Sequence, residues 1–257
     1  MNKLTVIFIA LASLLSLPQL MFCQENQDDP LAGAIQQVRD ADIKGDFKLY
    51  MRNHSLFERL ISAEPENHTA KYYLAYTEFK LFQMKQANVK VDVSKYYDSA
   101  VDICKELIEK KQLDAEAKIV LAGLYMMRLS ENQMEAMSLM PEIFKLLDEA
   151  EAMPGKHPRA AIIRGIMLLN VPEMFGGSID KAIDNFLKAI SIFENGDKEN
   201  PVVWGYQEAY AWLGQSYVKK NQINEAKQTY MKVLEIAPDY AWVKYVLLPA
   251  LDKENKN

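Results

Sequence analysis

Apolar residues recur three or four positions apart along nearly the whole chain beyond residue 30, and short breaks rich in Pro, Asn, Asp and Gly separate them. This spacing is the period of an amphipathic α-helix. Residues 89–93 alternate like a β-strand, but no other stretch of similar length could pair with them. We therefore expect an extended loop there, leading into a helix that Ser94 caps. The pattern predicts an all-α chain.

The clearest internal unit spans residues 207–240 and predicts a pair of antiparallel helices. Its small and large positions are Tyr210, Leu213, Gly214, Tyr217, Ala226, Tyr230, Val233 and Pro238. Gly214 and Ala226 are small where two helices cross closely, and Pro238 ends the second helix.

The same alternation of small and large residues is found upstream in weaker form. It places Ala161, Gly165 and Leu168 before Ala182, Phe186 and Ala189; Leu121, Ala122 and Tyr125 before residues 134–153; Tyr72, Ala75, Tyr76 and Phe79 before Ala100, Cys104 and Leu107; and Phe57, Leu60 and Pro65 at the end of a first unit. In the long turn 170–178, Pro172 ends one helix and Ser178 caps the next. Residues 134–153 are expected to form an over-long helix that Pro141 kinks. We predict about five hairpins and a capping helix over residues 240–251.

The N-terminus has the layout of a secretory signal peptide, in which Lys3 precedes an uncharged apolar stretch and the chain turns polar at Gln24. We predict a signal peptide at 1–23, a flexible segment at 24–30, one repeat domain at 31–251 and a charged tail at 252–257. The protein is then exported, to the periplasm or outside the cell. Residues 20–23 also look like a degraded lipobox with Phe22 in place of a small residue, so acylation of Cys23 and membrane anchoring is the alternative.

Charge and motifs exclude several classes of function. The formal charge is −5 and the lysines are scattered, so the basic stripe typical of nucleic-acid binding is missing. The sequence contains no nucleophile elbow, phosphate-binding glycine loop, zinc helix or Cys-x-x-Cys pair. The histidines, His54, His68 and His157, are far apart and are expected to be solvated or capping groups. We predict a non-enzymatic protein with no catalytic residues, metal or cofactor.

These repeat positions resemble those of tetratricopeptide-repeat (TPR) proteins along the whole chain after the signal peptide. Residues 175–182, Phe-Gly-Gly-Ser-Ile-Asp-Lys-Ala, together with the export signal, resemble the periplasmic T component associated with TRAP transporters. The resemblance implies an all-α, TPR-like superhelix of irregular antiparallel hairpins with a C-terminal capping helix. It implies a scaffold that binds a protein or peptide partner, or alternatively a carrier of a small hydrophobic, lipid or organic-acid ligand.

In the proteins that this chain resembles, the first helix of each repeat lines a concave groove. Carrying those positions over gives Tyr73, Thr77 and Lys80; Ile119, Met126 and Met127; Ile162, Ile166 and Leu169; and Glu208, Ala211, Gln215 and Lys219. The middle of this series is apolar and its ends are polar. It is a ligand-binding surface if the groove is open, or ordinary core if residues 134–153 fold over it. The sequence leaves both alternatives open.

Overall fold

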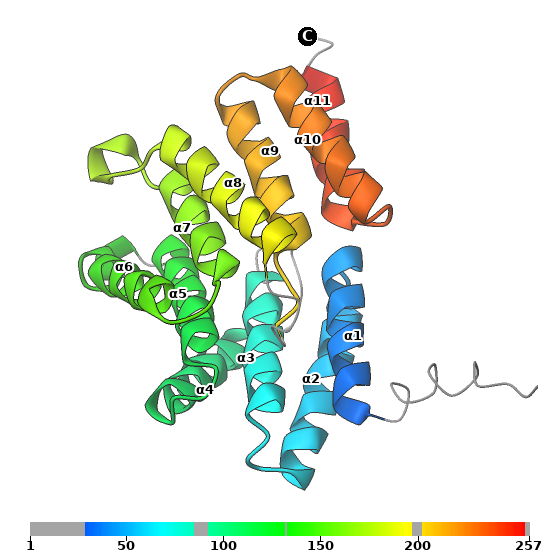
Figure 1. Ribbon diagram of the computed structural model, residues 1–257, viewed down its shortest axis with the longest axis vertical. Coiled ribbons are helices and arrows are strands. Elements are labelled where there is room, and N and C mark those ends of the chain that lie inside the picture. Colours follow the sequence, from blue (N-terminus) through cyan, green and yellow to red (C-terminus); the bar gives the residue numbers. More distant parts are fainter. Residues whose placement is uncertain (1–28, 85–91, 132, 197–201, 255–257) are drawn as a thin grey trace, which may run out of the picture.

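The computed structural model describes residues 29–84, 92–131, 133–196 and 202–254 (Figure 1). The predicted signal peptide, Cys23, most of the segment 24–30 and the end of the charged tail lie outside these ranges. Within the described part of the chain, no helix has the length and apolarity needed to cross a lipid bilayer.

The described residues form helices and no strands, and consecutive helices pack as antiparallel hairpins (Figure 1). The helices are α1 (Pro30–Lys44), α2 (Phe47–Ala63), α3 (His68–Gln83), α4 (Ser94–Glu109), α5 (Asp114–Glu131), α6 (Ala136–Ala152), α7 (Pro158–Asn170), α8 (Ile179–Asn195), α9 (Tyr206–Lys219), α10 (Ile223–Ile236) and α11 (Leu248–Glu254). Five hairpins, from α1–α2 to α9–α10, stack side by side, and a final helical segment covers the last one. The predicted all-α, TPR-like superhelix is confirmed.

Short polar side chains begin several of these helices, because they accept hydrogen bonds from the free N–H groups of the first turn. Ser178 caps α8 as predicted, through the N–H of Lys181. The prediction that Ser94 caps α4 was wrong. Ser94 is the first residue of the helix, and the carboxylate of Asp92 accepts from its N–H at 3.0 Å.

Two segments differ from the expected helix pattern. Residues 134–153 are not one over-long helix, because a 3₁₀ turn, Gln133–Glu135, precedes α6. Pro141 lies inside α6. The capping segment begins with a π-helical turn, Trp242–Leu247, and continues as α11.

In each of the last two hairpins, an aromatic ring of one helix packs directly against a glycine of the other. A Cβ atom on Gly214 of α9 would lie 2.2 Å from the Tyr230 ring of α10. A Cβ on Gly165 of α7 would lie 2.7 Å from the Phe186 ring of α8. Tyr230 and Phe186 are fully buried. The small positions read from the sequence are therefore those that let the paired helices touch.

We expect Gly214→Ala to lower the free energy of unfolding by about 1–3 kcal/mol, because the added methyl group overlaps the buried Tyr230 ring. Gly33→Ala in α1 is the matched control. Nothing lies within 4 Å of its added Cβ, so the same change should raise stability by about 0.5–1 kcal/mol. Urea denaturation followed by circular dichroism measures both. Equal effects of the two substitutions would contradict this account of the helix crossing.

Candidate binding site

The centre of the concave face is filled by the chain's own segment 202–205, which connects α8 to α9. The Trp204 ring stacks on Tyr76 of α3 with ring centroids 4.9 Å apart, and its Nε1–H donates to the Tyr72 hydroxyl at 2.8 Å. The N–H of Val203 donates to the Tyr73 hydroxyl at 3.2 Å. A Cβ on Gly205 would lie 3.0 Å from Ile162 of α7. Residues from the first helices of two repeats therefore contact this segment instead of a ligand.

Arg159, in the first turn of α7, fixes the segment in this position. Its Nε donates to the Trp204 carbonyl at 2.8 Å, and one terminal nitrogen donates to the Val202 carbonyl. The other terminal nitrogen donates to Glu116 of α5 at 3.1 Å. Only 2% of Arg159 is exposed. All three guanidinium nitrogens thus donate a hydrogen bond. One carboxylate and two carbonyl groups compensate the buried positive charge of Arg159.

The predicted groove residues are distributed between the interior and the surface. Buried are Tyr73, Thr77, Ile119, Met127, Ile162, Leu169 and Ala211; half-buried are Lys80, Met126, Ile166, Glu208 and Gln215; Lys219 is exposed. α6 does not supply the cover, since it is the hairpin partner of α5. The binding role of these residues stays a prediction.

The polar ends of the predicted groove join the first repeats to the last one. Lys80 of α3 lies with its Nζ 2.6 Å from Glu208 of α9 and 3.8 Å from Asp42 of α1. Asp42 also accepts hydrogen bonds from the Tyr50 and Tyr76 hydroxyls, at 2.5 and 3.0 Å. Ile43 of α1 packs against the apolar cluster formed by α10 and the capping helix. The superhelix therefore closes on itself.

Asp42, Glu208 and Lys80 form a cluster of two carboxyl groups and one ammonium group, so carboxyl groups outnumber the cation. Burial raises the pKa of Asp42 from 3.8 to about 6, while the nearby Lys80 charge lowers it. Burial lowers the pKa of Lys80, but Glu208 and Asp42 outweigh this effect and raise it overall. Lys80 thus stays charged, and Asp42 changes its protonation state near its raised pKa of about 6.

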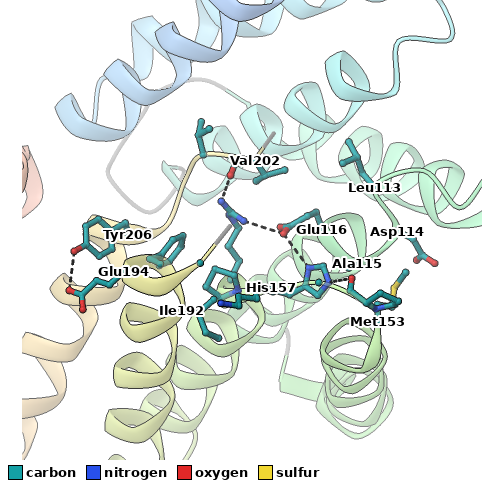
Figure 2. Close-up of a pocket in the computed structure, with 18 of the residues that line it drawn as sticks. Leu113, Asp114, Ala115, Glu116, Met153, His157, Ile192, Glu194, Val202 and Tyr206 are labelled. Carbon is teal, nitrogen blue, oxygen red and sulfur yellow. Dashed lines mark hydrogen bonds and ion pairs between the residues drawn. The ribbon is translucent and has the colours of Figure 1, made fainter. Parts of the chain in front are cut away.

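A cleft of about 780 Å³ opens beside the filled groove (Figure 2). The N-terminal ends of α5, α7 and α9 and the C-terminal end of α8 line it, together with Arg39 of α1. Figure 2 shows Glu116 and His157 together on one side and Tyr206 with Glu194 on the other. Apolar walls come from Met153, Ile192, Phe193 and Val202. The volume falls within the ~300–1,000 Å³ range of ligand sites.

The carboxylates in this cleft have partners of their own. Glu116 binds Arg159, and its Oε1 lies 3.5 Å from His157 Nδ1, which raises the pKa of His157. Asp114 pairs with Lys118 at 3.0 Å. Glu194 accepts from the hydroxyls of Tyr206 and Tyr210.

Two cations in the cleft have no carboxylate partner among the described residues. Arg39 is exposed and forms no hydrogen bond or ion pair with another residue that the structure describes, and among those residues the Lys156 Nζ donates only to the Asn195 carbonyl. Positive charge is therefore available to a ligand.

The sequence did not point to these residues. Arg159, Glu116 and Trp204 carry no recognisable motif, and their partners lie 43–45 positions or more away along the chain. The expectation that His54 is a solvated or capping group was wrong. His54 is buried in α2 with Nε2 3.0 Å from Glu78 Oε1. In the described part of the chain, no three His, Cys, Asp or Glu side chains are placed to hold a metal ion.

Comparison with known proteins identifies the repeat and the fold. Residues 207–240 match the tetratricopeptide repeat family model. A thermophilic TPR protein from Thermus thermophilus has a similar structure, with a TM-score of 0.62, 21% identity, and coverage of 86% of this chain and 97% of that one. The HusA haemophore from Porphyromonas gingivalis is also similar, with a TM-score of 0.62, 22% identity, and coverage of 75% and 94% respectively. No curated protein matches the sequence significantly.

We expect Arg159→Met to lower the free energy of unfolding by about 3–5 kcal/mol, because it leaves Glu116 charged and buried without its main partner. Adding Glu116→Gln should recover part of the loss. Arg164→Met is the control; its partners Asp148 and Glu151 are 70% and 28% exposed, so solvent screens both pairs and the cost should be smaller, about 1 kcal/mol. Chemical denaturation of the four proteins measures these differences. A loss for Arg159→Met no larger than that for Arg164→Met would contradict the anchoring role.

The raised pKa of Asp42 predicts that its contribution to stability is lost as pH rises. The folded state holds the proton more tightly than the unfolded state, so this contribution is present below pH 3.8 and disappears as pH passes about 6. The stability of Asp42→Asn relative to the wild type should therefore increase across this interval and level off above it. Denaturation over a pH series tests this. A carboxyl ¹³C titration of Asp42 with its midpoint below 4 would refute it.

Proposed function

We propose that this protein is a non-enzymatic TPR scaffold that holds an extended, acidic segment of a partner protein in the cleft beside its filled groove. The observation that carries the proposal is the cleft itself, in which the native carboxylates are already paired while Arg39 and Lys156 have no carboxylate partner among the described residues. A ligand that brings its own carboxylates would complete the ion pairs.

The ends of the helices around the cleft favour the same kind of ligand. The first residues of α7 and α9 face the cleft, and neither helix has a side-chain cap. Uncapped N-termini carry partial positive charge and free N–H groups, which attract anions. Apolar walls at Met153, Ile192 and Phe193 offer contact to side chains that flank a carboxylate.

We also propose that the protein acts outside the cytoplasm. The apolar N-terminal stretch before Gln24 supports export, with anchoring through an acylated Cys23 as the alternative. The likeness of residues 175–182 to the T component of TRAP transporters supports a place beside a transporter. A TPR scaffold there would bind its partner outside the cytoplasm.

A second candidate is a carrier of a small apolar acid. The cleft combines apolar walls with two available cations, which suits a hydrophobic ligand with carboxylate groups. One of the proteins with a similar fold is a haemophore, so haem is a reasonable probe along with fatty acids.

We expect acidic fluorescent peptides to bind the purified protein, with basic peptides of equal length binding far more weakly. Arg39→Glu should weaken this binding at least about tenfold, because it replaces an available cation with a repelling charge. Fluorescence anisotropy measures the affinity, and added salt should lower it.

The control for that experiment is Arg59→Glu, the same change at an exposed arginine of α2 outside the cleft. It should leave peptide binding unchanged. Titrations with haem and a fatty acid use the same proteins. Binding of these probes that depends on Arg39, without peptide binding, would replace the first candidate by the second. Absence of Arg39-dependent binding of any kind would refute both.

A further inference from the structure

The loop between α7 and α8, residues 171–178, projects from the body of the molecule (Figure 1). Exposed apolar side chains lie at its tip. Met174 is 83% exposed and Phe175 is 63% exposed. Single exposed large apolar side chains are common on protein surfaces, but two adjacent ones at the tip of a projecting loop are a candidate contact site.

The loop has a defined conformation that holds this tip outward. The N–H groups of Phe175 and Gly177 both donate to the Pro172 carbonyl, at 2.9 and 3.1 Å. At the base, the N–H of Ser178 donates to the Leu168 carbonyl at 2.9 Å. Gly176 has φ 95°, which favours glycine, and a Cβ on Gly177 would lie 1.7 Å from the Val171 carbonyl oxygen. A pre-formed tip loses little conformational entropy on binding.

A small notch of about 270 Å³ lies beside the base of the same loop. Phe144 of α6 and Leu168 of α7 give it an apolar lining, and Arg164, Lys181, Asp184 and Asn185 complete its wall. It is smaller than the ~300–1,000 Å³ of typical ligand sites, so it suits a side chain better than a bound molecule. Leu187, 45% exposed, lies one turn beyond Asp184 on α8 and extends the apolar surface.

The tip and the notch also carry complementary charges. Glu173 stands next to Met174 on the tip, and Lys181 stands at the notch. Neither forms an ion pair with another described residue. Because Phe175 is exposed, it does not occupy the notch of its own molecule.

We propose that this face binds a second copy of the chain, with the Met174–Phe175 tip of each copy in the notch of the other and Glu173 paired with Lys181 across the interface. The base of the tip loop adjoins the notch at the Leu168–Ser178 hydrogen bond, so a two-fold axis beside this bond would bring both tip–notch pairs together at once. The occupant is a second copy because one surface supplies both halves of the contact. This inference does not rest on the cleft or its ligand.

Sedimentation velocity over a micromolar concentration series tests this proposal on the purified protein. We expect a monomer–dimer equilibrium whose dissociation constant rises at least about tenfold in Phe175→Ser. Lys181→Glu should weaken the dimer by like-charge repulsion with Glu173, and Glu173→Lys combined with Lys181→Glu should restore it.

Tyr245→Ser is the matched control, since Tyr245 is 68% exposed on the C-terminal capping segment, away from the loop. It should dimerise like the wild type, and circular dichroism should show all variants folded. A wild type that stays monomeric throughout the series, or a Phe175→Ser dimer as tight as that of the wild type, would overturn the proposal. Recovery of binding in the double charge swap separates a direct contact from an indirect effect.

Discussion

A guanidinium group cannot be buried without partners for its charge and its N–H groups, and this requirement at Arg159 organises the concave side of the protein. The partners are Glu116 on the preceding repeat and two carbonyl groups of the segment 202–205. Because those carbonyls must reach Arg159, the segment lies across the first helices, and Trp204 packs among the tyrosines of α3. What would be a binding groove in an open TPR superhelix is core at its centre.

The same arrangement explains why a cleft remains at the edge. The segment 202–205 covers α3 and α7 but leaves the N-terminal ends of α5, α7 and α9 facing the solvent. Helix ends must satisfy their free N–H groups, and those of α7 and α9 have no side-chain cap. The filled centre of the groove and the polar cleft at its edge thus both result from the position of the segment 202–205.

The helices and hairpins could be predicted from the sequence because their determinants are local. Gly214 and Tyr230, or Gly165 and Phe186, lie within one hairpin, and their spacing is visible in a single repeat. The Ser94 cap was wrongly predicted because Ser94 is the first residue of α4, and Asp92, which is also a good capping residue, accepts from its N–H two positions earlier. The filled groove could not be predicted, since Val203 meets a tyrosine 130 positions away and the segment has no periodicity. His54 was missed because its partner Glu78 lies on another helix.

Most solenoid proteins are nearly one-dimensional, because each repeat contacts only its neighbours and repeats can be added or lost at little cost. The Lys80–Glu208 pair and the packing of Ile43 on the C-terminal cluster join elements that are far apart in that series. Insertion or deletion of a single hairpin would rotate the last repeat away from the first and separate these groups. These contacts therefore tie the present number of repeats to the geometry of the closed chain, whereas a change of length within a surface loop would leave them in place.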